Sequence, residues 1–319
     1  MREIGGYMQF ETYYGPEYHE DAIGFNTARS SIKYIQSIEN YNKYYIPYYL
    51  CDCMFEMLDE LSIDYEFYHV DKEMLPAIEH EVKENECVYI VNYFGQVANE
   101  TILNLKKRYK NIIFDNTQAF FQKAVEGIDT IYSCRKYFGV SDGAYLYTDK
   151  KMESELEPDV NYNRFNYLIG RYEMGASMFF KEFQTADYNL KYKELKGMPK
   201  LTRNILKSLD YTRIKSVRED NFNYLNKRLF KYNKLIDLKT GTFMYPLMID
   251  NADEVRKNLI SKKVFVPTLW PNVFDIENKK SYDYKFTEQI VPIPIDQRYG
   301  QEEMKFIADE IEALLGKDE

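Results

Sequence analysis

Two residues that could do chemistry lie at the ends of neighbouring apolar segments. Asp115 directly follows Ile112–Phe114, and Lys136 comes three residues after Thr130–Ser133. An aspartate can pair with the protonated nitrogen of a pyridine ring, and a lysine amine can form a Schiff base with an aldehyde. An enzyme must supply these two groups to hold and use pyridoxal phosphate. A cofactor-dependent enzyme is therefore the leading interpretation.

Each residue also has an ordinary structural interpretation. Asp115 begins the sequence Asp-Asn-Thr-Gln, which is typical of a helix start, so its carboxylate could be a simple cap. The apolar neighbours of Lys136, Tyr137 and Phe138 among them, favour the uncharged amine that acts as a nucleophile. A surface lysine whose aliphatic stem covers apolar side chains would have the same neighbours. The functional interpretation of the pair therefore depends on what surrounds it.

Three other segments carry groups that suit a flat, phosphorylated ligand. Asn26–Ser30 opens a segment of helical periodicity, and the backbone N–H groups at a helix start attract phosphate, although most such starts bind nothing. Gly95 lies just after an apolar run, where the backbone must turn. Tyr48 and Tyr49 could stack on a ring, but core packing is the commoner role of paired tyrosines.

The composition limits the class of protein. With 319 residues the chain can form one large α/β domain and a smaller one. The net charge of −9, without a basic block, disfavours binding to nucleic acid or to an anionic membrane. No apolar run is long enough to span a bilayer, and none at the start of the chain resembles a signal peptide. We therefore expect a cytoplasmic protein.

The cysteines and histidines predict neither disulfides nor a metal site. All four cysteines lie in or beside apolar stretches, which fits a reducing compartment. Cys51-Asp-Cys53 has the wrong spacing for a zinc knuckle, and no second pair of cysteines or histidines completes one. The three histidines are scattered along the chain. We therefore expect no metal.

Helix and strand patterns alternate between about residues 25 and 150. Ile32, Ile35 and Ile38 recur at the spacing of one helical face, after potential caps at Asn26 and Thr27. Other segments are apolar at successive positions, which suits strands covered on both faces. The strands expected are Tyr44–Leu50, Tyr65–Val70, Cys87–Phe94, Ile112–Phe114, Thr130–Tyr132 and Ala144–Tyr147, with helices at Cys53–Leu61, Met74–Lys83 and Asn99–Arg108. This alternation predicts an α/β fold, a mostly parallel sheet with helices on both faces.

The pattern changes after the last of these strands. Gly139 and Asp142-Gly143 predict that the chain reverses just after Lys136. Residues 151 to about 235 are charged, rich in Asn and Tyr, and largely helical by period. We expect them to form a helical bridge that belongs to a large domain over residues 1–235.

Residues 236–319 predict a small C-terminal α+β domain. The elements expected are strands at Phe243–Ile249, Val264–Val266 and Ile290–Ile295, a helix at Ala252–Ser261, and a last helix whose apolar stripe runs from Met304 to Leu314. A loop that contains prolines, Pro267–Lys280, interrupts them and is expected to shape a substrate site.

Several motifs occur in an order that resembles a known family. They are Thr-Ala at 27–28, Ile-Pro-Tyr-Tyr at 46–49, Val-Asn-Tyr-Phe-Gly-Gln at 91–96, Ile-Ile-Phe-Asp-Asn-Thr-Gln-Ala at 112–119, and Ser-Cys-Arg-Lys at 133–136 before Asp-Gly at 142–143. This order resembles the DegT-type aminotransferases, fold-type-I pyridoxal-phosphate enzymes that include many nucleotide-sugar transaminases. The resemblance is strongest over residues 20 to 150. Downstream, segments that begin at Met198, Arg218 and Val291 look like the bridging helices and C-terminal domain of that family.

The resemblance implies a role for each residue that matches a motif. Asp115 would pair with the pyridine nitrogen, Gln118 would contact the hydroxyl of the ring, and Lys136 would be the Schiff-base lysine. Asp115 and Lys136 would be the catalytic residues.

The phosphate and the ring face have implied partners too. Thr27 and Ala28, together with Ser133, would form the phosphate site. A tyrosine after Pro47 would stack on the ring, and Tyr49 is the better match of the two.

The implied activity is transfer of an amino group from an amino acid, with glutamate the expected donor, to a keto acceptor. The family suggests a nucleotide-linked keto sugar, a role in sugar or polysaccharide biosynthesis, and a homodimer. Leu195–Met198 stands where many sugar transaminases have Asn-Tyr-Arg-Met, and the spacing from Ser133 to Lys136 is shorter than usual, so the acceptor is less defined than the cofactor. Decarboxylation, elimination or aldol cleavage of a small amino acid stays open, because the same electron sink serves them all. A non-catalytic binding or regulatory relative would be expected to have lost the lysine or the aspartate.

Overall fold

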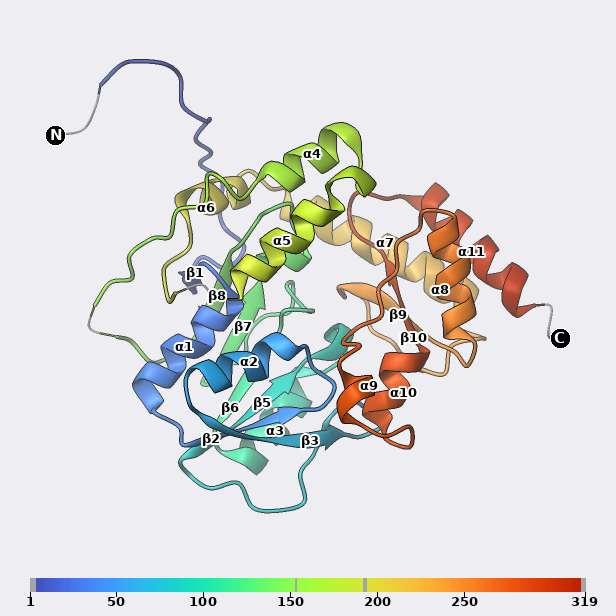
Figure 1. Ribbon diagram of the computed structural model, residues 1–319, viewed down its shortest axis with the longest axis horizontal. Helices are drawn as coiled ribbons and strands as arrows, with labels where there is room; N and C mark the ends of the chain where they lie inside the picture. The colour runs from blue at the N-terminus through green and yellow to red at the C-terminus, as the bar shows by residue number, and fades with distance from the viewer. Residues whose placement is uncertain (1–3, 153, 192–193, 317–319) are drawn as a thin grey trace.

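A mixed sheet forms the centre of the molecule in the computed structural model, which describes residues 4–152, 154–191 and 194–316. Its strand order is β1-β8-β7-β6-β5-β2-β3-β4 (Figure 1). The strands are β1 Ile23–Phe25, β2 Lys43–Pro47, β3 Asp64–Val70, β4 Pro76–Ala77, β5 Glu86–Val91, β6 Ile112–Asp115, β7 Asp129–Ser133 and β8 Ala144–Tyr147. The run from β7 to β3 is parallel throughout, whereas β8, β1 and β4 join their neighbours antiparallel. The predicted mostly parallel sheet is confirmed.

The register of the central strands brings their carboxyl ends to one edge. All six residues of β5 are buried, as expected for a strand covered on both faces. Val91 of β5 pairs with Asp115 of β6, which in turn pairs with Ile131 of β7. Because ligands of open α/β sheets bind at the carboxyl ends of the strands, Asp115 lies where a ligand is expected.

Three helices follow the alternating pattern of the first half. They are α1 Ala28–Glu39, α2 Asp52–Glu60 and α3 Asn99–Tyr109, and they pack mainly against β7 and β8, against β3, and against β6 respectively. In α1, the predicted face is buried through Ile32 and Ile35. The Thr27 hydroxyl accepts a hydrogen bond from the Ser30 N–H (3.1 Å), so Thr27 is the cap of this helix.

Two predicted elements are wrong. The helix expected at Met74–Lys83 is an irregular segment that contains β4, because Pro76 interrupts it and Met74 has a positive φ of 60°. The strand expected at Val264–Val266 is also irregular. Lys263 has a φ of 63° and the Val264 N–H bonds to the Leu259 carbonyl (2.9 Å), which closes the preceding helix instead of starting a strand.

Helices fill most of the stretch between the two predicted domains. They are α4 Asn166–Met174, the 3₁₀ helix η3 Ser177–Phe179, α5 Phe180–Leu190, α6 Lys200–Leu206 and α7 Tyr211–Leu229. The Asp210 carboxylate caps the longest of them, α7, by accepting from the Arg213 N–H (2.9 Å). Neither these helices nor any other within the described ranges is long and apolar enough to cross a membrane.

A second core forms on the right of Figure 1, around an antiparallel strand pair. Its elements are β9 Met244–Met248, β10 Ile290–Pro294, α8 Ala252–Ser261 and α11 Gln301–Leu315. Phe222, Leu225 and Leu229 of α7 are fully buried in the same core. The small α+β unit is therefore present, and the domain boundary predicted between residues 235 and 236 stays a prediction.

Two short helices that the sequence did not predict connect the second core to the large sheet. These are α9 Val273–Ile276, inside the predicted loop, and α10 Tyr282–Gln289. In Figure 1 they lie between the β9–β10 pair and β3, and α10 contacts β3, β9, β10 and α8. Fully buried Asp283, in the first turn of α10, accepts a hydrogen bond from the Val70 N–H of β3 (3.3 Å).

Candidate active site

Asp115 is a buried carboxylate held by two donors. Its side chain is among the buried polar groups, and Oδ1 accepts from the Thr117 N–H (2.7 Å) while Oδ2 accepts from the Tyr89 hydroxyl (2.6 Å). Tyr89 and Asp115 can meet because alternate residues of adjacent strands share a face, and Tyr89 pairs with Ile113, two residues before Asp115. Burial and the neighbouring carboxylate raise the pKa of Tyr89, so the hydroxyl stays protonated and donates a hydrogen bond to Asp115. A turn follows Asp115, so the helix-cap interpretation is wrong.

Amide side chains join the ends of the strands next to Asp115. The fully buried Asn92, after β5, donates from Nδ2 to Asn116 Oδ1 (2.8 Å) and to Gln122 Oε1 (2.7 Å). Asn92 Oδ1 accepts from the Val97 N–H (2.9 Å), and Asn116 Nδ2 donates to the Tyr132 hydroxyl (3.2 Å). Because each of these buried groups has partners, the network fixes the backbone around Asp115 without adding charge.

Lys136 ends the short helix η2 Cys134–Lys136, which follows β7. Its Nζ lies 5.3 Å from the centre of the Phe243 ring, a cation–π distance. The carbonyl of the next residue, Tyr137, accepts from Gln297 Nε2 (2.7 Å) and from Arg218 (3.4 Å). Arg218 also donates to the Phe243 carbonyl (3.2 Å).

Arg218 therefore ties the lysine segment to the second half of the chain. Its guanidinium is 1% exposed, so it is buried on α7, and it lies 4.4 Å from the centre of the Tyr137 ring. Its Nε donates to Gln297 Oε1 (3.0 Å). Burial lowers the pKa of Arg218, but an arginine stays charged in a protein. A buried charge spread over carbonyl and amide oxygens is a rigid anchor for the backbone on which Lys136 lies.

The start of α1 carries the predicted phosphate residues. Thr27 is buried and caps the helix, Ala28 begins it, and Arg29 follows in the first turn. The Arg29 guanidinium donates to the Leu190 carbonyl (2.7 Å), and its buried Nε has no hydrogen-bond partner among the described residues. Ser133 ends β7, half-buried and paired with Ala144.

Cys51 and Cys53 lie in this group, although the sequence had given them no role. Cys51 is the N-cap position of α2, and the two Sγ atoms are 2.7 Å apart. The hydrogen bond with Cys53 and burial raise the pKa of Cys51, while the charges of Lys136 and Arg29 act against that rise. The hydrogen bond from Cys51, assisted by Arg29, lowers the pKa of Cys53 to about 7. The thiols therefore lie close to both cations.

Gln118 supports a strained turn beside the site. Its Oε1 accepts from the Phe94 N–H (2.8 Å), and its backbone carbonyl accepts from the Tyr137 hydroxyl (2.7 Å). Phe94 has a φ of 52°, which is rare for a residue with a side chain, and Gly95 follows at 66°. A Cβ on Gly95 would lie 3.3 Å from Ala119 Cβ, so the close approach and the positive φ both favour glycine there.

Tyr49 has core neighbours. It is fully buried, and its ring packs against Trp270 (4.5 Å), Tyr93 (5.0 Å) and Phe286 (5.6 Å). Tyr48 stacks on two other side chains of the large sheet. The structure thus surrounds the Tyr49 ring with aromatic side chains of the core, and its predicted stacking on a cofactor stays a prediction.

The structure brings the other predicted residues to one edge of the sheet. Cys51 and Cys53 lie between Asp115 and Lys136, since both thiols are near enough to act on the pKa of Tyr89, the partner of Asp115, and Lys136 is near enough to act on the pKa of Cys51. Tyr89 could have been found from its place two residues before Val91, on the strand next to Asp115. Arg218 gave no such signal, because its contacts come from distant parts of the chain.

Comparison with solved structures identifies the fold family, whereas comparison of sequences finds no match. No protein-family model matches the sequence, and no curated protein matches it either. A putative sugar aminotransferase from Streptococcus pneumoniae in its PLP form has a TM-score of 0.64 at 11% identity, over 96% of this chain and 93% of that one.

Two other solved structures give the same result. A DegT DnrJ EryC1 StrS aminotransferase from Brucella abortus has a TM-score of 0.63 at 12% identity, over 95% of this chain and 91% of that one. Helicobacter pylori PseC, an aminotransferase of pseudoaminic acid biosynthesis, has a TM-score of 0.61 at 14% identity, over 91% and 85%. The chain therefore has the fold of the DegT-type sugar aminotransferases.

Proposed function

We propose that this protein is a pyridoxal-phosphate-dependent aminotransferase of the DegT type. The observation that carries the proposal is a buried, doubly hydrogen-bonded carboxylate at the end of β6, together with a lysine in the short helix that follows the adjacent strand β7. The fold supports it, because the three solved structures compared above are described as aminotransferases, one of them as a putative sugar aminotransferase. Two polar groups at adjacent strand ends would be weak support without that likeness.

The side chains at this edge fit the cofactor. A partner for a protonated ring nitrogen has to be an oriented carboxylate, and Asp115 is one. A phosphate needs donors, and the first turn of α1 offers backbone N–H groups without helical partners. The buried Nε of Arg29, unpartnered within the described ranges, would gain an acceptor there. The residues proposed to bind the cofactor are Thr27, Ala28, Gln118, Ser133, Asp115 and Lys136, with Tyr49 as the predicted stacking ring.

Asp115 would act by holding positive charge on the ring nitrogen. Pyridoxal phosphate, when bound, draws electrons away from the substrate carbon that loses its proton. The carboxylate can favour that withdrawal only while it stays ionised and aimed at the ring. The Thr117 N–H and the Tyr89 hydroxyl both donate hydrogen bonds to the carboxylate and fix its orientation.

Lys136 would bind the cofactor covalently and then serve as the acid and base. Once free, its Nζ would carry a proton from the α-carbon of the amino donor to the cofactor, and in the second half of the cycle it would carry a proton from the cofactor to the acceptor carbon. Arg218 and Gln297 hold the Tyr137 carbonyl, so the backbone beside Lys136 has little freedom. A proton carrier has to lie within hydrogen-bond reach of its target, and a fixed backbone would help to keep Lys136 at that distance.

Glutamate as donor and a nucleotide-linked keto sugar as acceptor follow from the family resemblance. The putative sugar aminotransferase from Streptococcus pneumoniae that shares the fold supports a sugar acceptor. The alternative is another pyridoxal-phosphate reaction on a small amino acid, such as decarboxylation, elimination or aldol cleavage. Only the response of the protein to an amino donor and a keto acceptor distinguishes that reaction from transamination.

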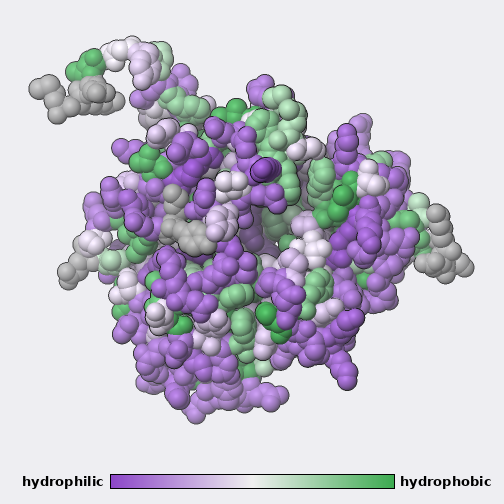
Figure 2. Space-filling view, in the orientation of Figure 1, coloured by the Kyte–Doolittle hydropathy of each residue, from purple (hydrophilic) through white to green (hydrophobic). Residues whose placement is uncertain are grey.

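A homodimer would explain the apolar surface of α4 and α5. Tyr172, Met174, Met178 and Phe180 are more than half exposed. Figure 2 shows green, apolar surface over this part of the molecule. Neighbouring exposed apolar side chains are typical of a protein interface. If the proposal holds, light scattering should give twice the mass of the chain, and Met178→Glu/Phe180→Glu should give one chain mass.

The visible spectrum of the purified protein tests the function. With added pyridoxal phosphate the wild type should show the absorption band of the lysine-bound cofactor, and glutamate should bleach it. Lys136→Ala should lack the band and Lys123→Ala, a lysine outside the group, should keep it. A wild type without the band would refute the cofactor assignment. A band that no amino donor bleaches would favour the other pyridoxal-phosphate reactions.

A further inference from the structure

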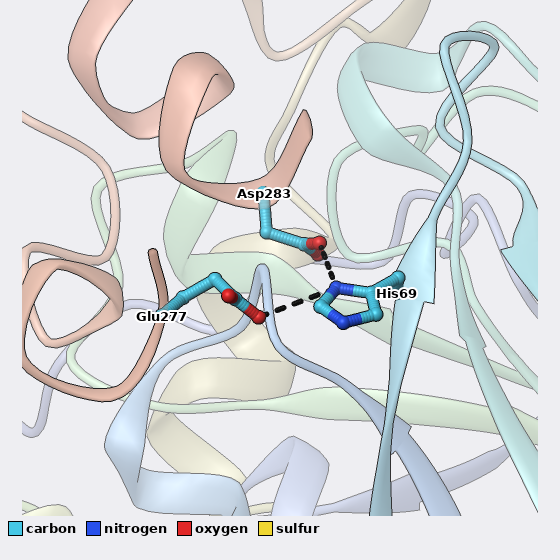
Figure 3. A group of neighbouring side chains, drawn as sticks. All are labelled: His69, Glu277 and Asp283. Carbon is cyan, nitrogen blue, oxygen red and sulfur yellow. Dashed lines mark hydrogen bonds and ion pairs between the residues drawn. The ribbon is translucent and has the colours of Figure 1, made fainter. Parts of the chain in front are cut away.

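Three side chains from distant parts of the chain converge at the end of β3, away from Asp115 and Lys136 (Figure 3). His69 Nδ1 lies 2.8 Å from Asp283 Oδ2 and 3.3 Å from Glu277 Oε2. One possible ligand atom of each residue lies within 4.8 Å of the others. The carboxylate side chains are 0% and 6% exposed, while the imidazole is 51% exposed. The cluster is thus closed on the carboxylate side and open to solvent on the histidine side.

Contacts outside the cluster orient each of the three groups. Asp283 Oδ1 accepts from the Val70 N–H (3.3 Å), and Glu277 Oε1 accepts from the Asn278 N–H (2.6 Å) and Nδ2 (2.7 Å). The imidazole of His69 stacks on the Tyr48 ring, 4.7 Å between centres and 26° between planes. Each residue therefore points one possible ligand atom toward the other two residues, and its contacts outside the cluster hold the side chain in that orientation.

The three atoms that face one another have too few hydrogens to satisfy both carboxylate oxygens. A ring nitrogen carries at most one hydrogen, and two carboxylate oxygens converge on this one. The shorter contact assigns that hydrogen to Asp283 Oδ2, which leaves the buried Glu277 Oε2 aimed at the cluster without a proton of its own. His69 is the ion-pair partner of both carboxylates among the described residues. Even a charged imidazole would leave one negative charge in excess, which burial makes costly.

We propose that His69, Glu277 and Asp283 bind one divalent transition-metal cation, with Zn²⁺ the best match. One nitrogen and two carboxylate oxygens are ligands that Zn²⁺ takes, and metal–ligand distances near 2.0–2.2 Å require ligand atoms roughly 3 Å apart. The nitrogen–oxygen distances of 2.8 and 3.3 Å meet that requirement. The exposed side of His69 leaves room for water as a further ligand. Two positive charges would balance the two carboxylates.

The cation would fasten a segment of the second half of the chain to the large sheet. Glu277 directly follows α9 and Asp283 lies in the first turn of α10, whereas His69 belongs to β3. The same segment carries Trp270, which packs on Tyr49. Metal binding would thereby hold in place the segment expected to shape the substrate site. The ion has a structural role here, and the binding itself does not depend on the proposed aminotransferase activity.

Calorimetric titration of the chelator-treated full-length protein with Zn²⁺ alone tests the site. The wild type should bind one equivalent, and His69→Ala should lower the affinity at least about 100-fold, since loss of even an outer contact costs 10- to 100-fold. Glu277→Gln should do the same. His80→Ala is the matched control, because His80 is equally exposed and has one carboxylate at 3.8 Å; its binding should be unchanged.

A second control separates this site from the thiols. Cys51→Ser/Cys53→Ser should keep the Zn²⁺ affinity of the wild type, and circular dichroism should show that every variant is folded. A wild type that binds no Zn²⁺, equal affinity in His69→Ala, or loss of binding in the double serine variant would overturn the proposal. An inactive enzyme that still binds Zn²⁺ through His69 would refute the proposed function and leave the metal site standing.

Discussion

The two polar clusters at the carboxyl edge of the large sheet balance their charges differently. At the end of β6, the Asp115 carboxylate has two donors, and Lys136 and Arg29 act on thiols beside it. At the end of β3, two buried carboxylates face a single ring nitrogen. Burial raises the pKa of Asp283, although the hydrogen bonds from His69 and the Val70 N–H act against that rise.

The difference shows what each cluster can accept. The first has a satisfied carboxylate and an unpartnered buried guanidinium nitrogen, so it suits a ligand with both a protonated nitrogen and a phosphate. The second lacks positive charge and suits a bare cation. The two sites differ in the balance of carboxylates against cations, because each of the three carboxylates has hydrogen-bond donors.

Asp115→Asn should have the largest effect. An amide is neutral and cannot stabilise a protonated ring nitrogen, so turnover should fall about 10²- to 10³-fold, as for loss of one key electrostatic group. The protein should still bind cofactor. Steady-state kinetics with glutamate and a keto acceptor measures the effect. Asp309→Asn, an exposed carboxylate of α11, should leave turnover unchanged, and wild-type turnover in Asp115→Asn would remove Asp115 from the account.

Arg218→Ala should lower the free energy of unfolding by about 3 kcal/mol. It would leave the Phe243 carbonyl and Gln297 Oε1 without the donor that Arg218 supplies, and each such loss costs roughly 1–3 kcal/mol; the Tyr137 carbonyl would keep Gln297 as a donor. Urea denaturation measures the change. Turnover at saturating cofactor should also fall, because the backbone of Lys136 is freed; a stable variant with normal turnover would show that the anchor is dispensable.

His19 offers a buried polar group that is neutral and fully partnered. Its Nε2 lies 2.9 Å from the Phe120 carbonyl and Nδ1 3.2 Å from the Tyr147 hydroxyl, and burial lowers its pKa from 6.5 to about 4. The imidazole takes up a proton at a higher pH in the unfolded chain than in the folded protein. The free energy of unfolding should therefore fall by about 3 kcal/mol as the pH falls from 6.5 to 4.

Urea unfolding of wild type and His19→Gln at several pH values tests this. The variant cannot titrate at this position, so its stability should fall less steeply over the same interval. Parallel curves for the two proteins would mean that His19 is not the group responsible.

Tyr89→Phe should have the smallest effect. It removes one of the two donors to Asp115 and keeps the ring, so the free energy of unfolding should fall by about 1 kcal/mol. Turnover should fall by no more than about tenfold, since the Thr117 N–H remains. A loss as large as that of Asp115→Asn would mean that the hydroxyl takes a direct part in the reaction.

Local sequence patterns were enough to predict most of the sheet and to single out two candidate residues at its edge. Successive apolar residues predicted β2, β3, β5, β6, β7 and β8, because a doubly covered strand has no polar face. Asp115 stood out because it directly follows such a strand, and Lys136 because it comes three residues after the next one. Met74–Lys83 was mistaken for a helix because its apolar residues have helical spacing, and Pro76 outweighs that spacing.

The remaining parts depend on contacts that no local pattern encodes. Arg218 and Gln297 reach Tyr137 from the second half of the chain, and His69 meets residues more than two hundred positions away. The histidines seemed scattered in the sequence, so no metal was expected. Tyr49 seemed suited to stacking because the resemblance implies a stacking tyrosine after Pro47, but two of its aromatic neighbours come from α10 and from the segment before α9.

Borohydride reduction followed by peptide mass mapping tests the central claim most directly. The wild-type protein, loaded with pyridoxal phosphate and reduced, should carry one pyridoxyl group, and it should lie on the peptide that contains Lys136. The same treatment of Lys136→Ala should yield no such adduct. An adduct on a different lysine, or none in the wild type, would contradict the assignment of Lys136 and with it the proposed chemistry.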